Sequence, residues 1–110
     1  MESFNFELNQ VIARTLAEGG FASEKEATRE ISLMVALAKI SRYERECAKF
    51  RKKYDQTFEE FQRKVNSNVG AEIFEEENDL MDWEFAENAL ALWQKRLEVL
   101  DGTMHRIGRR

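Results

Sequence analysis

Few residues of this chain could carry out catalysis. His105 is the one histidine and Cys47 the one cysteine among 110 residues. A Cys-His nucleophile pair needs both side chains in one place. His105 lies in a basic C-terminal segment, whereas Cys47 lies at an apolar position of a helical pattern, where a small buried thiol is ordinary. The positions of these two residues therefore do not indicate a catalytic centre.

Carboxylates are numerous, but their pattern does not predict a metal centre. Glu84 and Glu87 lie close to one helical turn apart. Di-iron sites in helical bundles take Glu-x-x-His pairs from facing helices, and the sequence contains no such pair. It also has no glycine-rich phosphate loop and no Ser-His-Asp set. We therefore expect no cofactor, no metal ion and no enzymatic activity, apart from an unrecognised acid-base pair of carboxylates.

The charged residues form two blocks of opposite sign. Residues 39–53 hold seven basic and two acidic side chains, whereas residues 72–87 hold eight acidic side chains and no basic one. In one interpretation the blocks face each other, because the last helix folds back antiparallel on the long one. Otherwise the acidic block docks on a basic partner, or the basic block binds the phosphates of DNA. The DNA contacts would then be Arg42, Arg45, Lys49, Lys52 and Lys53.

Glycines divide the chain into helical segments. Proline is absent, and the five glycines fall between the apolar-periodic segments, where helix C-terminal caps belong. Residues 4–18, which end at Gly19-Gly20, are predicted to be an amphipathic helix. Its apolar residues recur at four-residue spacing: Phe4, Leu8, Ile12 and Leu16. The alternation over residues 4–8 would instead suit a short strand before a helix from Asn9.

The longest predicted helix begins at a capping box of Ser23 and Glu26 and runs to about Tyr54. At 1.5 Å per residue it spans about 45 Å. Residues 31–38 are apolar at every position except Ser32, so we expect a second copy of the chain to cover one side of them. The expected dimer interface consists of Ile31, Leu33, Met34 and Leu37.

Thr57 and Glu60 form a second capping box, which opens a short helix. Residues 71–78 are predicted to be an acidic connector, and Asp79 to cap a last helix that ends at Gly102. The apolar stripe of this helix consists of Trp83, Ala86, Leu90, Trp93, Leu97 and Leu100, widened by Phe85, Ala89 and Leu92.

Composition agrees with one all-α domain over residues 1–102 followed by a flexible basic tail over 103–110. The chain is 43% hydrophobic and 35% charged, with a net charge of -4. So short a chain completes its core with difficulty, which favours a homodimer. The net charge disfavours nucleic acid as a partner, and the lack of a long apolar run indicates a cytoplasmic protein that binds no membrane.

Two stretches resemble small antitoxins of bacterial and archaeal toxin-antitoxin pairs. Residues 20–31 and the following Leu33 to Leu37 resemble the turn and second helix of antitoxins that include the ribbon-helix-helix kind. Residues 50–61, with Lys53-Tyr54 and Phe58-Glu59, and residues 76–86, with Asp82-Trp83-Glu84, are similar to small helical antitoxins. The resemblance implies a protein that neutralises a partner toxin by covering its functional surface.

The sequence therefore predicts a non-enzymatic interaction protein. Its partner surface is expected on the acidic segment and the start of the last helix: Glu76, Glu77, Asp79, Asp82, Trp83 and Glu84. Trp83 is the expected aromatic anchor, while Trp93, flanked by leucines, is expected to pack inside. The alternatives are a DNA-binding regulator and a structural homodimer.

Overall fold

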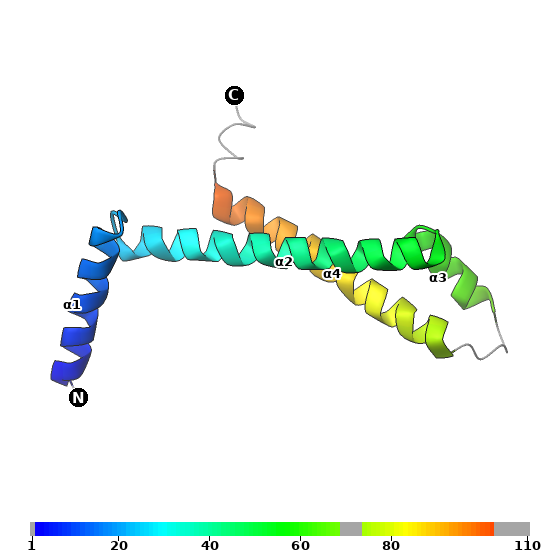
Figure 1. The fold of residues 1–110 in the computed structure, drawn as a ribbon, viewed down its shortest axis with the longest axis horizontal. Helices are drawn as coiled ribbons and strands as arrows, with labels where there is room; N and C mark the ends of the chain where they lie inside the picture. The colour runs from blue at the N-terminus through cyan, green and yellow to red at the C-terminus, as the bar shows by residue number, and fades with distance from the viewer. Residues whose placement is uncertain (1, 69–73, 103–110) are drawn as a thin grey trace, which may run out of the picture. The chain divides into compact units, whose positions relative to one another are not determined.

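A computed structural model describes residues 2–68 and 74–102 as four helices (Figure 1). These are α1 (Glu2–Glu18), α2 (Glu24–Tyr54), α3 (Phe58–Ser67) and α4 (Phe74–Asp101). No strand occurs among the described residues, which confirms the all-α class, and α1 is helical where a short strand was the alternative. None of the described helices is both long and apolar enough to cross a membrane. The predicted tail, 103–110, lies outside the described residues.

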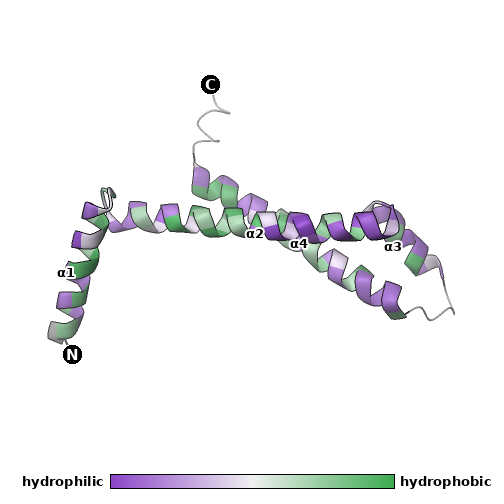
Figure 2. Cartoon of the chain, viewed as in Figure 1, coloured by the Kyte–Doolittle hydropathy of each residue, from purple (hydrophilic) through white to green (hydrophobic). Residues whose placement is uncertain are grey.

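The chain divides within α2 into two compact units, an N-terminal unit (Met1–Val35) and a C-terminal unit (Ala36–Arg110). Hydrophobic residues recur along α1 and the first half of α2, whereas the second half of α2 is largely hydrophilic (Figure 2). Each unit is described separately below.

In the N-terminal unit, α1 ends at the glycine pair as predicted. Gly20 has φ +94°, a conformation that glycine adopts without steric cost. The N–H of Phe21 donates to the carbonyl of Leu16 (2.9 Å), and that of Gly20 to the carbonyl of Ala17 (3.1 Å), the two bonds of a Schellman cap. At the start of α2, the N–H of Glu26 donates to Ser23 Oγ (3.1 Å), as the first capping box requires.

In the C-terminal unit, α4 runs antiparallel to the second half of α2. Phe50 stacks on Trp83 with ring centroids 5.7 Å apart, and about one turn later in α2 Lys53 bonds to Asp79, which lies about one turn earlier in α4. The buried core residues come from three helices: Tyr43, Cys47 and Phe50 of α2, Phe61 of α3, and Trp83 and Ala86 of α4. The antiparallel pairing expected from the charge blocks is therefore confirmed.

A tight turn joins α2 to α3. Asp55 has φ +50°, a left-handed conformation that aspartate tolerates better than most residues. Thr57 then caps α3. Its Oγ1 accepts from the N–H of Glu60 (3.1 Å), and its own N–H donates to Glu60 Oε1 (2.8 Å). The second capping box is therefore confirmed in full.

The last helix begins earlier than expected. We predicted an acidic connector through residue 78 and a cap at Asp79, but α4 begins at Phe74, and only residues 71–73 of that connector lie outside the described residues. Glutamate favours helix, and Glu75, Glu76 and Glu77 lie in the first turn, next to the positive end of the helix dipole. Asp79 bonds to side chains of α2.

Candidate interaction surfaces

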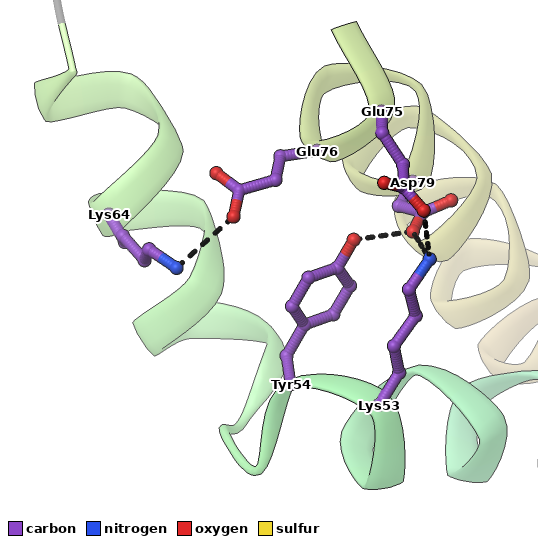
Figure 3. A network of polar contacts seen from close by, with 6 residues as sticks. All are labelled: Lys53, Tyr54, Lys64, Glu75, Glu76 and Asp79. Atoms are coloured by element: carbon purple, nitrogen blue, oxygen red, sulfur yellow. Dashed lines mark hydrogen bonds and ion pairs between the residues drawn. The ribbon is translucent and has the colours of Figure 1, made fainter. Parts of the chain in front are cut away.

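A polar network joins the ends of α2 and α3 to the start of α4 (Figure 3). Lys53 Nζ lies 2.6 Å from Asp79 Oδ2 and 2.9 Å from Glu75 Oε1. The hydroxyl of Tyr54 donates to the same Asp79 oxygen. On α3, Lys64 Nζ lies 3.2 Å from Glu76 Oε2. Lys53 of the basic block and Lys64 of α3 therefore pair with carboxylates of the acidic block within the chain.

The network changes the protonation of its members. Partial burial disfavours the charged form of Asp79, but hydrogen bonds from Lys53 and Tyr54 outweigh it and hold the pKa of Asp79 below its usual value. The hydrogen bonds to Asp79 and Glu75 raise the pKa of Lys53. Burial and the bond to Asp79 raise the pKa of Tyr54 to about 12. At neutral pH Asp79 is thus a carboxylate held by an ammonium group and a phenol.

Trp83 lies in the core. Its side chain has 0% exposure, with the rings of Phe50, Phe58 and Phe61 at centroid distances of 5.7, 5.6 and 5.5 Å. The indole N–H donates to Glu87 Oε1 (3.2 Å), so its one polar group is satisfied. This burial corrects the assignment of Trp83 to a partner surface, because no partner can contact the ring in this fold. Trp93 packs against the edge of the same core, as expected.

The other acidic residues of the predicted partner surface separate into two groups. Glu76 and Asp79 are held in the polar network, whereas Glu77, Asp82 and Glu84 are exposed. Glu84 Oε2 lies 3.5 Å from Gln62 Nε2 of α3. Only the exposed three present their carboxylates to a partner.

The predicted DNA-binding residues are also divided. Lys53 is held by Asp79 and Glu75, whereas the other four are exposed. These follow each other at three- and four-residue spacing, which places them on one side of α2: Arg42, Arg45, Lys49 and Lys52. We call these four residues the basic stripe.

The predicted dimer residues lie on a part of α2 that contributes little to a core. Ile31, Met34 and Leu37 are exposed, and Leu33 is half-buried. The homodimer itself stays a prediction.

The N-terminal unit presents apolar surface that the sequence did not assign to a site. On α1, exposed apolar residues occur within the four-residue series and outside it: Phe4, Phe6, Leu8, Val11 and Ile12. On α2, Ile31, Met34 and Val35 are exposed as well. Among the described residues of this unit, Ala27 is the only buried hydrophobic side chain, at 2% exposure. The small size of this unit could have predicted the exposure, because two helices cannot enclose a core.

Phe85 and Leu92 were expected to widen the core-facing stripe of α4, but both are exposed. An α-helix turns about 100° per residue, so Phe85 lies about 200° around the axis from Trp83, and Leu92 lies equally far from Leu90. The helical angle therefore turns both residues away from the centre of the core, although the Phe85 ring still meets that of Tyr43 edge-on, with centroids 6.0 Å apart.

Cys47 does not offer a reactive thiol. Burial, followed by the neighbouring carboxylate of Glu87, raises the pKa of Cys47 to about 11, so the nucleophilic thiolate is scarce at neutral pH. Within residues 2–68 and 74–102, no three histidine, cysteine or carboxylate side chains are grouped to hold a metal ion. Comparisons with protein-family models, with curated proteins and with solved structures find no match to this chain.

Proposed function

We propose that this chain is a non-enzymatic interaction protein whose N-terminal unit binds a partner protein. The observation that carries the proposal is the imbalance in this unit, where eight large apolar side chains are exposed and Ala27 is the only described hydrophobic residue that is buried. Contiguous exposed apolar surface marks interaction sites in proteins that are otherwise rich in charge. The unit gains its missing core when a partner covers it.

The pattern on α1 suits one mode of recognition. Phe4, Leu8 and Val11 lie at positions i, i+4 and i+7, the spacing with which an amphipathic helix places its anchors in a hydrophobic groove. Ordering the helix costs conformational entropy, which the burial of these anchors offsets. The partner surface is therefore expected to be an apolar groove.

The resemblance to small helical antitoxins supports a toxin as the partner, neutralised by occlusion in the cytoplasm. Trp83 is buried and has no part in this contact, whereas the exposed carboxylates Glu77, Asp82 and Glu84 would attract a toxin with a basic surface. Charge then steers the encounter, and the apolar residues of α1 supply the affinity.

The test measures binding to the protein that the neighbouring reading frame encodes, by titration calorimetry. Val11→Glu should weaken binding at least about thirtyfold, which is about 2 kcal/mol. Asn9→Glu is the matched control, because it adds the same charge at an exposed position about 160° around the axis of α1 from Val11. No binding by the unmodified chain would reject the toxin as partner, and equal effects of the two variants would reject α1 as the binding surface.

A second candidate function rests on the basic stripe of α2. Four exposed cationic side chains on one side of a helix could bind the phosphates of DNA. Binding to duplex DNA, followed by fluorescence anisotropy, should then fall with salt with a logarithmic slope of about -3 to -4, from about -0.9 per phosphate contact. Arg45→Gln should make that slope less steep by about one, because one phosphate contact is lost. Failure to bind duplex DNA at low salt would remove this candidate.

A further inference from the structure

The outer face of α4 carries a second apolar stripe. It consists of Phe74, Met81, Phe85, Leu92 and Val99, all between 47% and 70% exposed. We call these five residues the outer stripe. The residues that face the core of the C-terminal unit, such as Trp83, Ala86 and Leu90, lie on another side of the same helix. α4 therefore has two apolar faces, and within the C-terminal unit the outer one is largely uncovered, its Phe85 ring meeting only the edge of Tyr43 with ring centroids 6.0 Å apart.

The outer stripe follows a heptad repeat. Phe85, Leu92 and Val99 are seven residues apart, as are Phe74 and Met81. Asn78 begins the first series, and Asn88 and Lys95 continue the second, so the two series alternate with spacings of four and three along the 28 residues of α4. This is the pattern of a coiled-coil seam, and it extends over about 37 Å from Phe74 to Val99.

The order of residues along the seam is self-complementary when one copy is reversed. If two α4 helices lie antiparallel about a twofold axis between Ala86 and Glu87, every seam position meets a seam position of the other copy. Phe74 then lies opposite Val99 of the second copy, and Met81 opposite its Leu92. A twofold contact requires such a surface, which must match itself. The polar Asn88, placed beside the axis, favours a single register.

Charge selects the antiparallel orientation. The first half of α4, residues 74–87, contains seven acidic residues and no basic one, whereas residues 88–101 contain two of each sign. A parallel pair would place the two acidic halves side by side, which costs energy through like-charge repulsion. In the antiparallel pair, Glu77 of one copy lies next to Lys95 and Arg96 of the other.

We infer that the outer stripe of α4 is the surface on which a second copy of this chain docks, antiparallel about the point between Ala86 and Glu87. This contact uses residues of the C-terminal unit only, whereas the helix proposed to bind the partner protein belongs to the N-terminal unit. It also differs from the dimer interface expected at residues 31–37.

The first experiment compares two methionines of equal exposure, Met81 in the outer stripe (69%) and Met34 in the N-terminal unit (68%). Sedimentation equilibrium of the full chain should report a dimer at micromolar concentration. Met81→Glu should raise the dimer dissociation constant at least tenfold, because the twofold axis places the charge at two sites of the interface. Met34→Glu should leave the constant unchanged, and both variants should keep their helical circular dichroism.

A monomeric unmodified chain would overturn the inference. So would dissociation by Met34→Glu with no effect of Met81→Glu, since the second copy would then occupy the α2 surface around residues 31–37.

The second experiment tests orientation and does not depend on the stability of a charged variant. Chains with Met81→Cys and Leu92→Cys are mixed, re-equilibrated and oxidised, with Cys47 retained because it is 1% exposed. The antiparallel register predicts a disulfide-linked dimer in the mixture. The Met81→Cys chain alone should not cross-link, because its two cysteines would lie about 16 Å apart along the axis. Efficient cross-linking of that chain with itself would contradict the antiparallel arrangement.

Discussion

Trp83 and Asp79 attach α4 to the other helices of the C-terminal unit in two different ways. The Trp83 ring contacts aromatic rings from both α2 and α3, so it joins all three helices of the C-terminal unit. Asp79 joins α4 to the end of α2, where it accepts hydrogen bonds from Lys53 and Tyr54. One residue acts through buried apolar area and the other through charge, so their contributions to stability can be separated by pH.

Trp83→Ala should lower the free energy of unfolding by about 3 to 5 kcal/mol, because it leaves a large cavity among the core aromatic rings. Urea denaturation followed by circular dichroism measures the change. Trp93→Ala is the control, since Trp93 is only partly buried and should cost less. Equal stability of Trp83→Ala and the unmodified chain would show that the ring does not support this core.

Tyr54→Phe should lower the free energy of unfolding by about 1 to 2 kcal/mol at pH 7, because it removes a hydrogen bond to a carboxylate. The ring keeps its stacking on Phe61, whose centroid is 4.1 Å away. Since the folded pKa of Asp79 is lowered, the stabilisation from its charged form is present above the unfolded pKa of about 3.9 and is lost as pH falls through the folded pKa.

The difference between Tyr54→Phe and the unmodified chain should therefore shrink as the pH falls below about 4. Urea denaturation at a series of pH values measures it. At the alkaline end, the raised pKa of Tyr54 stabilises the fold below pH 10, and that contribution is lost as pH rises through about 12. A loss of stability independent of pH from 7 to 2 would mean that the hydroxyl acts through packing alone.

At the scale of elements, the turn between α2 and α3 decides where the chain reverses. Asp55 leaves the helical conformation with φ +50°, and Thr57 starts α3 two residues later with its complete capping box. The short α3 places Phe58 and Phe61 against Trp83. A ten-residue helix is marginal by itself, so its cap and these ring contacts are what keep it formed.

Thr57→Ala should lower the free energy of unfolding by about 1 kcal/mol, because the N–H of Glu60 loses its acceptor. Glu60→Gln is a useful companion variant, since glutamine can keep the reciprocal bond to the Thr57 backbone. The pKa of Glu60 is lowered by its hydrogen bonds with Thr57, so the stabilisation by this carboxylate should weaken in acid. Thermal unfolding of both variants tests this, and an unchanged midpoint for Thr57→Ala would show that the cap is dispensable.

At the scale of the whole molecule, the packed core and the helix proposed to bind a partner protein lie in different units. In sequence, the buried core residues range from Tyr43 to Ala86, and the partly buried residues that pack on them range from Tyr54 to Trp93. No described residue of the N-terminal unit belongs to that core. The C-terminal unit therefore has the means to fold without the N-terminal unit, whose exposed apolar surface is the proposed partner site.

Removal of residues 1–35 should change the free energy of unfolding of the rest by less than about 1 kcal/mol, because no core contact is lost. Near-ultraviolet circular dichroism of the tryptophans reports whether the core stays packed, and thermal unfolding reports its stability. If the shortened chain lost its tryptophan signal, the N-terminal unit would have to contribute to the core.

Several elements could be predicted from the sequence because their signals are local. The stop at Gly19-Gly20 follows from the positive φ that the Schellman cap requires at Gly20, and the start of α3 follows from the Thr57-Glu60 box. The antiparallel pairing of α2 and α4 was predicted from the apolar heptads of both helices together with two blocks of opposite charge. The helix ends are specified by residues within a few turns of each other, and the pairing is specified by patterns that each helix carries along its own sequence.

Only the tertiary structure decided which face of each helix is covered. Trp83 has acidic neighbours in sequence and read as an exposed anchor, yet three aromatic rings from α2 and α3 enclose it. Asp79 read as a helix cap, but Lys53 and Tyr54 bring their donors to it from a segment 25 or 26 residues away. Burial and pairing depend on which side chains from distant parts of the chain pack at a position. The residue pattern within one helix does not contain that information.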